Sequence, residues 1–132
     1  MSKNFSITKK IYYHDTDAGG VVYYANYLKY LEEGRSEYCA QLGIHTGELA
    51  KKEVLFVVAR VEIDYKSPAR YQDSIRVETE VEAVSRSSVK FNQQIKIADR
   101  ILIQAKVTWV CVNAQIKPIA IPLDVKQLMA SQ

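Results

Sequence analysis

Three strand-forming stretches, joined by short turns, dominate the second half of the chain, and the first two alternate between apolar and polar residues. They run from Ile75 to Ala83, from Val89 to Ile97 and from Ile101 to Val112. A period of two residues predicts β-strands with one buried and one solvated face. Because turns this short connect antiparallel neighbours, the three strands form an antiparallel meander, and its apolar face needs a cover.

One helical pattern ahead of the meander supplies that cover. Apolar side chains recur there at intervals of three, four and seven residues, which places them on one helix face, and Gly43 follows as a stop signal. We also expect strands from Phe5 to Tyr13 and from Leu55 to Lys66, and a short helix between Pro122 and Met129. A sheet covered by one long helix is an α+β architecture. The expected helix face comprises Tyr24, Leu28, Leu31, Tyr38 and Leu42.

Length and composition bound the possible functions. The chain has 132 residues, 48% of them hydrophobic and 25% charged, so we expect one globular domain over residues 1–132. A net charge of +3 does not call for a nucleic-acid partner. Cys39 and Cys111 are far apart and cannot assemble a zinc site with two histidines, so we expect buried free thiols and no metal. Met1 to Tyr13 has no long apolar run and no small-residue cleavage site, so we expect no signal peptide. No stretch approaches the roughly 20 apolar residues that span a bilayer, so we expect a cytoplasmic protein without a membrane span.

The strand near Leu55 to Val58 is apolar on both faces. A sheet of this size has nothing of its own to bury the outer face of such a strand. Pairing with a second copy would bury it, so we expect a homodimer at minimum, with a continuous sheet.

The segment most informative about chemistry, Tyr12 to Tyr27, places Asp15, Asp17 and the Gly19-Gly20 pair just before the long helix. Amide groups at a helix N-terminus have no intrahelical acceptor and can hold a developing negative oxygen. A carboxylate beside them can attack an activated carbonyl or activate water for that attack. On spacing alone, however, loop and capping roles are the commoner ones for such aspartates.

The run from Asp15 to Tyr27 resembles the signature of the 4-hydroxybenzoyl-CoA thioesterase family. It is more similar to the branch encoded beside the bacterial Tol–Pal genes, the YbgC-like acyl-CoA thioesterases. The resemblance covers nearly the whole chain, and its first motif is the specific one. The later parts are Leu28–Tyr30, Glu32, Arg35–Glu37, Val61–Arg70 and Pro118–Pro122.

The resemblance implies a hotdog fold, an antiparallel sheet wrapped around one long central helix, in dimers that often pair into tetramers. It implies that Asp17 is the catalytic carboxylate, that backbone amides near Tyr24 polarise the thioester carbonyl, and that Tyr13 lines the same site. The expected substrate-binding residues are Gly20, Val21, Val22, Tyr23, Tyr27 and Phe56.

The sequence departs from the Tol–Pal branch at Tyr24, where that branch usually has histidine and the hydroxybenzoyl branch has tyrosine. A backbone role for this position survives the change. A proton-carrying role for an imidazole does not, so substrate preference is left open.

Coenzyme A is part of the substrate, so no separate cofactor is expected. Its phosphates favour Lys, Arg and backbone donors. Two sets of basic and polar residues are candidates, one at the start of a strand and one after the Leu55 strand. Each residue taken singly could instead be an ordinary exposed surface residue without a role in binding. The candidate CoA-binding residues are Arg86, Ser87, Ser88 and Lys90, with Lys66 and Arg70 as the second group.

The leading function is therefore hydrolysis of an acyl-CoA thioester to free acid and CoA, with Asp17 as nucleophile or general base. Hydration or dehydration of acyl thioesters is a rival on the same fold, but His14 and His45 do not match the motif of those enzymes. A second rival is a binding module for acyl carrier protein or a Tol–Pal-like partner, with weak or vestigial activity. The acyl group, aromatic or aliphatic, is left open.

Overall fold

The computed structural model describes residues 5–130 and contains one five-stranded antiparallel sheet with the strand order β1-β3-β4-β5-β2. The elements in chain order are β1 (Phe5–Lys10), η1 (Tyr13–Asp15), α1 (Asn26–Gln41), α2 (Thr46–Lys51), β2 (Leu55–Tyr65), β3 (Ser74–Val84), β4 (Ser88–Ile97), β5 (Arg100–Val112) and α3 (Leu123–Ala130).

The expected meander is confirmed. Strands β3, β4 and β5 are consecutive antiparallel neighbours, and the structure adds β1 at one edge and β2 at the other. The first strand is shorter than expected, because the chain leaves the sheet after Lys10. Ile11 instead exchanges backbone hydrogen bonds with the loop before β3, its N–H donating to Asp73 O at 2.8 Å and its carbonyl accepting from Gln72 N–H at 2.9 Å.

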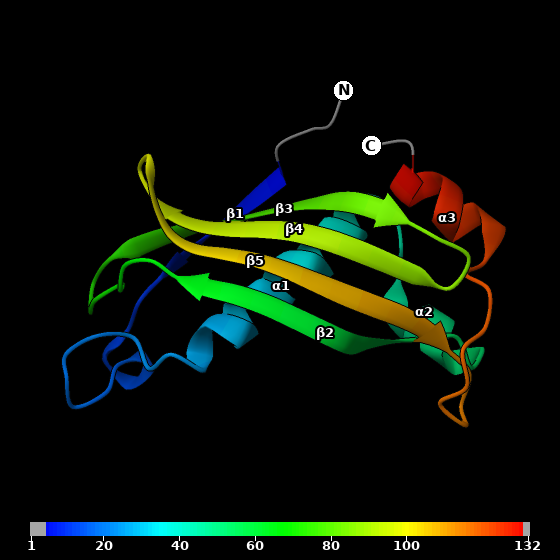
Figure 1. The fold of residues 1–132 in the computed structure, drawn as a ribbon, viewed down its shortest axis with the longest axis horizontal. Coiled ribbons are helices and arrows are strands. Elements are labelled where there is room, and N and C mark those ends of the chain that lie inside the picture. The colour runs from blue at the N-terminus through cyan, green and yellow to red at the C-terminus, as the bar shows by residue number, and fades with distance from the viewer. Residues whose placement is uncertain (1–4, 131–132) are drawn as a thin grey trace.

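The sheet curves around α1, which lies behind it in Figure 1. This α+β arrangement is the one that the resemblance implies. The helix approaches β3 and β4 closely at Gly34, where a Cβ atom would lie 2.8 Å from Val77 Cγ1 and 2.9 Å from Thr79 Oγ1. Glycine is therefore the residue that lets helix and sheet come together here.

The buried face of α1 is only partly the expected one. Leu31 and Tyr38 are buried as expected, but Leu28 is 43% exposed and Tyr24 lies before the helix, 62% exposed. The physical reason is that a glycine and an arginine occupy the face that meets the sheet, so hydrophobic periodicity marks it poorly. The buried residues of α1 are Tyr27, Tyr30, Leu31, Gly34, Arg35, Tyr38 and Cys39.

Arg35 is the unusual member of this face. Its Nη1 donates to Gln93 Oε1 at 3.0 Å, and its guanidinium lies 5.9 Å from the centre of the Trp109 ring. Gln93 in turn donates to Leu31 O and Thr79 Oγ1, each at 2.9 Å. This polar network ties the middle of α1 to β3 and β4.

The core divides into two clusters along the helix. One surrounds Tyr27 and Tyr30 near the start of α1, and the other surrounds Tyr38, Phe91 and Trp109 near its end. The expectation that α1 is the only cover is incomplete, because α3 closes the second cluster with Val125 and Met129. The C-terminal helix itself was expected, whereas α2 was not.

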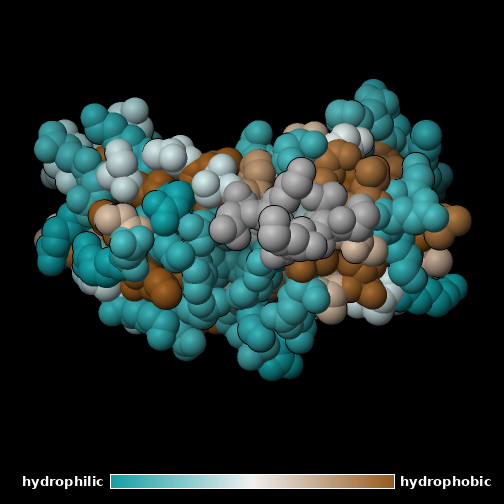
Figure 2. All heavy atoms as spheres, turned by 90° about the horizontal axis from the view of Figure 1, so that it is seen from above, coloured by the Kyte–Doolittle hydropathy of each residue, from teal (hydrophilic) through white to brown (hydrophobic). Residues whose placement is uncertain are grey.

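Both cysteines are free and buried, as expected. Burial raises the pKa of the Cys39 thiol to about 12, and it also raises the pKa of Cys111. Within residues 5–130, no helix is both long enough and apolar enough to cross a membrane. Figure 2 shows hydrophobic surface toward the end of the molecule that carries α3, and α3 leaves Leu123 and Leu128 exposed.

Candidate active site

The Asp17 segment is a tight turn. Asp17 N–H donates to Val21 O at 2.9 Å, and Gly20 N–H donates back to Asp17 O at 3.0 Å. Gly20 has a φ of 80°, which a residue with a side chain rarely adopts. The turn is joined to the loop after β2, because Val22 N–H donates to Ala69 O at 2.9 Å and Val21 bridges Arg70.

The Asp17 carboxylate is exposed at this turn. Its Oδ1 accepts a hydrogen bond from Gly19 N–H at 2.8 Å, and within residues 5–130 its other oxygen has no hydrogen-bond partner. The carboxylate is therefore held in place by one short local bond and keeps one oxygen available for a reaction.

Asp15 has a different role from Asp17. Its carboxylate is buried and accepts two hydrogen bonds, from Tyr12 N–H at 2.9 Å and from Tyr30 Oη at 2.8 Å. Burial pushes the pKa of Asp15 up, but these hydrogen bonds and the nearby charges of His14 and Lys9 outweigh it, so the pKa lies below its ordinary value. The two oxygens are fully used, so Asp15 holds the loop onto α1.

The amide groups ahead of α1 supply donors. Asn26 N–H donates to Tyr23 O at 2.8 Å, which closes a turn before the helix, and Asn26 Nδ2 donates to Asp15 O at 2.9 Å. In the part of the chain that the structure describes, the N–H groups of Tyr24 and Ala25 have no acceptor. Free amides at a helix N-terminus are suited to hold a negative oxygen.

Tyr24 also lines a pocket of about 240 Å³. Its wall is aromatic: the Tyr65 ring lies 6.1 Å from the Tyr24 ring and 5.9 Å from the Tyr27 ring, centre to centre. Burial raises the pKa of Tyr27 and of Tyr65, so both phenols are neutral near pH 7. The pocket is lined by Val21, Val22, Tyr24, Tyr27, Tyr65, Lys66, Ser67 and Pro68.

No three His, Cys, Asp or Glu side chains within residues 5–130 are grouped to hold a metal ion. The chemical groups at the turn and the pocket are thus a carboxylate, free backbone amides and neutral phenols. Such a set fits attack on a carbonyl carbon, with the amides stabilising the oxygen that becomes negative.

Comparison of the sequence with known protein families identifies the family of this chain. The model of the thioesterase-like superfamily matches residues 12–129. The chain belongs to the thioesterase-like superfamily. This confirms the relationship inferred from the Asp15 to Tyr27 signature.

Individual relatives agree with the superfamily. An acyl-CoA thioesterase YbgC of Haemophilus influenzae is 39% identical over 96% of this chain and 94% of its own length. The acyl-CoA thioester hydrolase YbgC of Escherichia coli is 36% identical over 88% of each chain. Among solved structures, a probable thioesterase from Bartonella henselae has a TM-score of 0.87 with 31% identity and covers 91% of this chain and 100% of its own. The chain described here therefore has the hotdog fold.

The structure brings some expected site residues of this thioesterase-family chain together. Four of the expected substrate-binding and catalytic residues line the pocket: Val21, Val22, Tyr24 and Tyr27. Tyr23 packs on Tyr24 with ring centres 5.1 Å apart, and Gly20 belongs to the Asp17 turn. Of the expected CoA-binding residues, Lys66 lines the pocket and Arg70 pairs with Val21.

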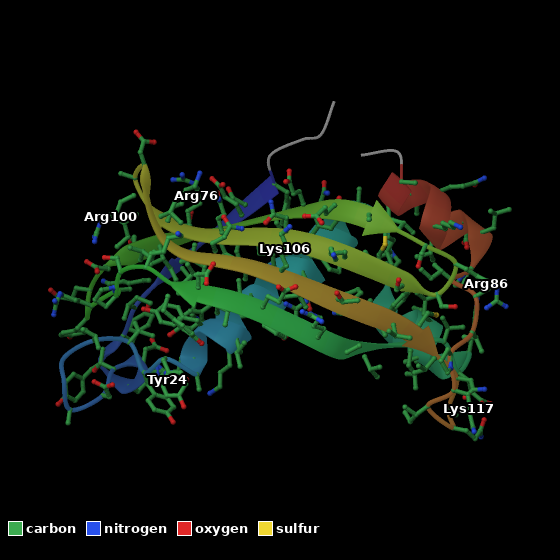
Figure 3. The ribbon with its side chains drawn as sticks, viewed as in Figure 1. Tyr24, Arg76, Arg86, Arg100, Lys106 and Lys117 are labelled. Carbon is green, nitrogen blue, oxygen red and sulfur yellow. The ribbon has the colours of Figure 1, made fainter. Side chains whose placement is uncertain are left out.

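Other predicted site residues lie away from the pocket within a single chain. Tyr13 is exposed and packs on Tyr71, with ring centres 5.8 Å apart. Phe56 packs on Trp109 at the opposite end of β2 from Tyr65. Arg86 lies at the opposite end of the molecule from Tyr24 (Figure 3), and Ser87 and Ser88 adjoin it in the β3–β4 turn. Lys90 is 3.9 Å from the Glu82 carboxylate on β3.

Sequence reasoning missed three pocket residues, Tyr65, Ser67 and Pro68. The alternating pattern that ends at Tyr65 places its ring on the core-facing side of β2, which is the signal that could have found it. Ser67 and Pro68 directly follow the strand expected from Leu55 to Lys66. Nothing local to them indicates that the Asp17 segment folds against this loop.

Proposed function

We propose that this protein hydrolyses acyl-CoA thioesters, with Asp17 as the reacting carboxylate. The observation that carries the proposal is an exposed Asp17 carboxylate with a free oxygen, in the turn that leads to two free amides and an aromatic pocket. Its nearly full-length relatives named acyl-CoA thioesterases support the substrate class.

Two mechanisms of hydrolysis are consistent with this proposal, and in each of them the bonds formed and broken balance. As a nucleophile, Asp17 bonds the acyl carbon, the C–S bond breaks and CoA leaves as thiolate; water then cleaves the mixed anhydride and restores the carboxylate. As a general base, Asp17 takes a proton from water, the hydroxide adds to the acyl carbon, and CoA leaves with the C–S bond electrons and then takes the proton. In both versions, the carbonyl oxygen becomes negative and the Tyr24 and Ala25 amides stabilise it.

The proposal is tested by release of free thiol from a series of short, long and aromatic acyl-CoAs, and from acyl carrier protein thioesters. Hydrolysis of at least one acyl-CoA with a kcat of about 1 s⁻¹ or more, an ordinary value for an enzyme, is expected. Binding without hydrolysis across the whole series would instead support a binding module.

Tyr24→Phe is expected to lower kcat by less than about tenfold, which is below roughly 1.4 kcal/mol of barrier. The phenylalanine removes only the hydroxyl and leaves the amide in place, and the Tyr65 hydroxyl donates to the backbone oxygen of residue 24, at 3.5 Å, rather than to the Tyr24 phenol. A pH–rate profile on one good substrate measures the change. A thousandfold loss would mean that the phenol itself donates to the substrate or orients Asp17.

Tyr24→His is the matched comparison. It restores the residue usual in the Tol–Pal branch and keeps the same backbone donor. If an imidazole carries a proton at this position, the variant gains a titration near neutral pH and a higher rate on short acyl-CoAs. An unchanged profile would leave the backbone amide as the whole contribution of residue 24.

We infer that the active species is a dimer joined through β2. This strand pairs only with β5 within residues 5–130, so its other edge is open. Val58 and Val61 are exposed although their strand partners on β5, Trp109 and Val107, are in the core. Directly paired residues lie on the same face of a sheet, so these valines extend the core face beyond its cover. A second copy is the occupant that would bury them.

Antiparallel pairing of two β2 strands also bears on the site. If the pairing is centred near Val58 and Val61, the partner subunit's Phe56 lies near Tyr65 of this chain, at the pocket. The β3–β4 turn with Arg86, which lies at the same end of the sheet as Phe56, then approaches the pocket as well. Phe56 and the turn with Arg86 would thus reach the pocket from the partner.

Val61→Lys is expected to convert the dimer to monomer and to lower activity at least about tenfold, because a lysine at an open strand edge opposes pairing. Leu123→Lys is the control, since it places the same charge on an exposed apolar position of α3. Sedimentation equilibrium and thiol release are measured on both. A wild-type monomer that hydrolyses acyl-CoA at full rate would contradict the inference, whereas a tetramer would not.

A further inference from the structure

Three cationic residues from different parts of the sequence lie in or next to the segments that form the pocket. Lys66 follows β2 and lines the pocket, and Arg70 lies in the next loop and pairs with Val21. Arg100 begins β5, and its Nη1 donates to the hydroxyl of Ser67, a pocket residue, at 2.8 Å. Arg100 and Tyr24 are at the same end of the molecule, opposite Arg86 and Lys117 (Figure 3).

These three cations have no counter-ion in the part of the chain that the structure describes. The eight ion pairs within residues 5–130 hold other cations. The nearest acids along the chain are Asp73, which accepts the backbone N–H of Arg70 at 2.8 Å, and Asp99, beside Arg100. Neither carboxylate lies within 4.0 Å of a cationic group of the cluster.

Arg76, near the same β4–β5 turn, shows the contrast. Its Nε donates to Glu78 at 3.0 Å and its Nη2 donates to Ala98 O at 3.1 Å, so its charge and its donors are used within the fold. Among residues 5–130, the Arg100 guanidinium has one side-chain hydrogen bond, to the neutral hydroxyl of Ser67. That bond restrains one side of the guanidinium and leaves the rest of its N–H fork available.

The position of the cluster indicates its ligand. The pocket wall is largely aromatic and apolar, which suits an acyl group or the uncharged pantetheine arm, and the three cationic residues beside it are exposed. Arg100 contacts Ser67 and not the Asp17 turn, so the cluster is displaced from the reacting centre. The phosphates of CoA are likewise separated from its thioester, by the pantetheine arm.

We propose that Arg100, together with Lys66 and Arg70, binds phosphate groups of coenzyme A and makes the enzyme prefer CoA thioesters over thioesters that lack phosphate. The inference rests on the proposed function and deepens it. An arginine fork binds phosphate oxygens in pairs, and charge-assisted bonds of this kind are about twice as strong as neutral ones. Arg100 is a binding residue here, so its contribution belongs to KM and not to the chemical step.

The test compares Arg100→Gln with Lys106→Gln, which removes one exposed charge from the middle of the sheet, away from both ends of the molecule (Figure 3). Each is assayed on one acyl-CoA and on the matching acyl-pantetheine, which carries no phosphate. For Arg100→Gln, the KM for acyl-CoA is expected to rise at least about tenfold, the effect of one lost charge-assisted bond, with kcat within about twofold. The KM for acyl-pantetheine is expected to stay at the wild-type value. Lys106→Gln should match wild type on both substrates.

A direct binding measurement supports this readout. Titration calorimetry of free CoA is expected to give a Kd about tenfold higher for Arg100→Gln than for wild type, with Arg100→Lys in between because it keeps the charge and loses the fork. Dephospho-CoA identifies which phosphate is bound. Added salt should weaken binding by wild type more than by Arg100→Gln.

Several results would overturn the inference while the proposed function stands. An equal loss on acyl-CoA and acyl-pantetheine would mean that Arg100 only shapes the pocket. No loss on either, with wild type active on both, would exclude a phosphate contact. A loss confined to acyl carrier protein thioesters would assign the cluster to an acidic protein surface. If wild type cleaves no thioester, the proposed function fails, and the CoA titration alone then tests the cluster.

Discussion

Asp17→Asn is expected to lower kcat at least about a thousandfold, roughly 4 kcal/mol of barrier, while the fold and the affinity for CoA stay near wild type. The change removes a reacting carboxylate oxygen. It does not disturb the turn, because asparagine keeps an oxygen that can accept the 2.8 Å hydrogen bond from Gly19 N–H. Since the side chain is exposed, no core contact is lost. Thiol release measures kcat, and the melting temperature reports the fold.

Asp15→Asn is the matched control, two residues away. Both Asp15 oxygens accept hydrogen bonds from buried or backbone donors, and an amide offers only one oxygen, so one donor loses its partner. The cost is about 1–3 kcal/mol of unfolding free energy, with kcat of the folded fraction retained. Asp17→Asn keeping most of its kcat, or equal kcat losses at the two positions, would show that the assignment of the reacting acid is wrong.

Asp15 should also make the stability of the protein depend on pH. The folded pKa of Asp15 lies below its ordinary value of 3.8, so its contribution to stability is fully present above that value. The contribution is lost as pH falls through the folded pKa. The melting temperature of wild type therefore decreases in acid by more than that of Asp15→Asn, which has no carboxylate there to protonate.

Gly34→Ala is expected to lower the unfolding free energy by about 2 kcal/mol, as overpacked cores do. The new Cβ would lie 2.8 Å from Val77 Cγ1 and 2.9 Å from Thr79 Oγ1, and 3.2 Å from Gln93 Nε2, which is itself held by two hydrogen bonds. These neighbours belong to the sheet and have little room to shift. Chemical denaturation of the purified variant measures the change.

Gly47→Ala provides the control for this prediction. Gly47 lies in α2, and no atom is within 4 Å of the position that its Cβ would take. Alanine is favoured over glycine in a helix by about 1 kcal/mol, so this variant should be as stable as wild type or slightly more so. A Gly34→Ala variant that gained stability like Gly47→Ala would show that α1 does not need to approach β3 so closely.

The sequence predicts the sheet of this structure better than it predicts the buried face of the long helix. The meander follows from alternation alone, and its strands begin and end within a residue or two of the expected positions. The buried face of α1 does not follow from hydrophobic periodicity, because Gly34 and Arg35 meet the sheet at positions where the periodicity predicts large apolar residues. Close packing and a polar network decide that face, and both depend on residues of β3 and β4 that are distant in sequence.

The candidate site shows the same limit. Resemblance singled out Asp17, and the structure separates it from Asp15 by the hydrogen bonds that each one makes. Spacing alone could not separate them, since both are aspartates ahead of a helix. The contribution of Tyr65, Ser67 and Arg100 depends on three loops meeting at one end of the sheet, and no local pattern encodes that meeting.

The two buried cysteines have a consequence for an enzyme whose proposed product is itself a thiol. Released CoA can be oxidised to its disulfide, and a protein thiolate that met this species would form a mixed disulfide with it. That exchange needs an accessible, ionised sulfur. Cys39 and Cys111 are enclosed by the core, and their pKa values are raised, that of Cys39 to about 12. Neither cysteine of the folded protein is therefore expected to form a mixed disulfide with oxidised CoA, so the proposed activity should not depend on the redox state of its surroundings.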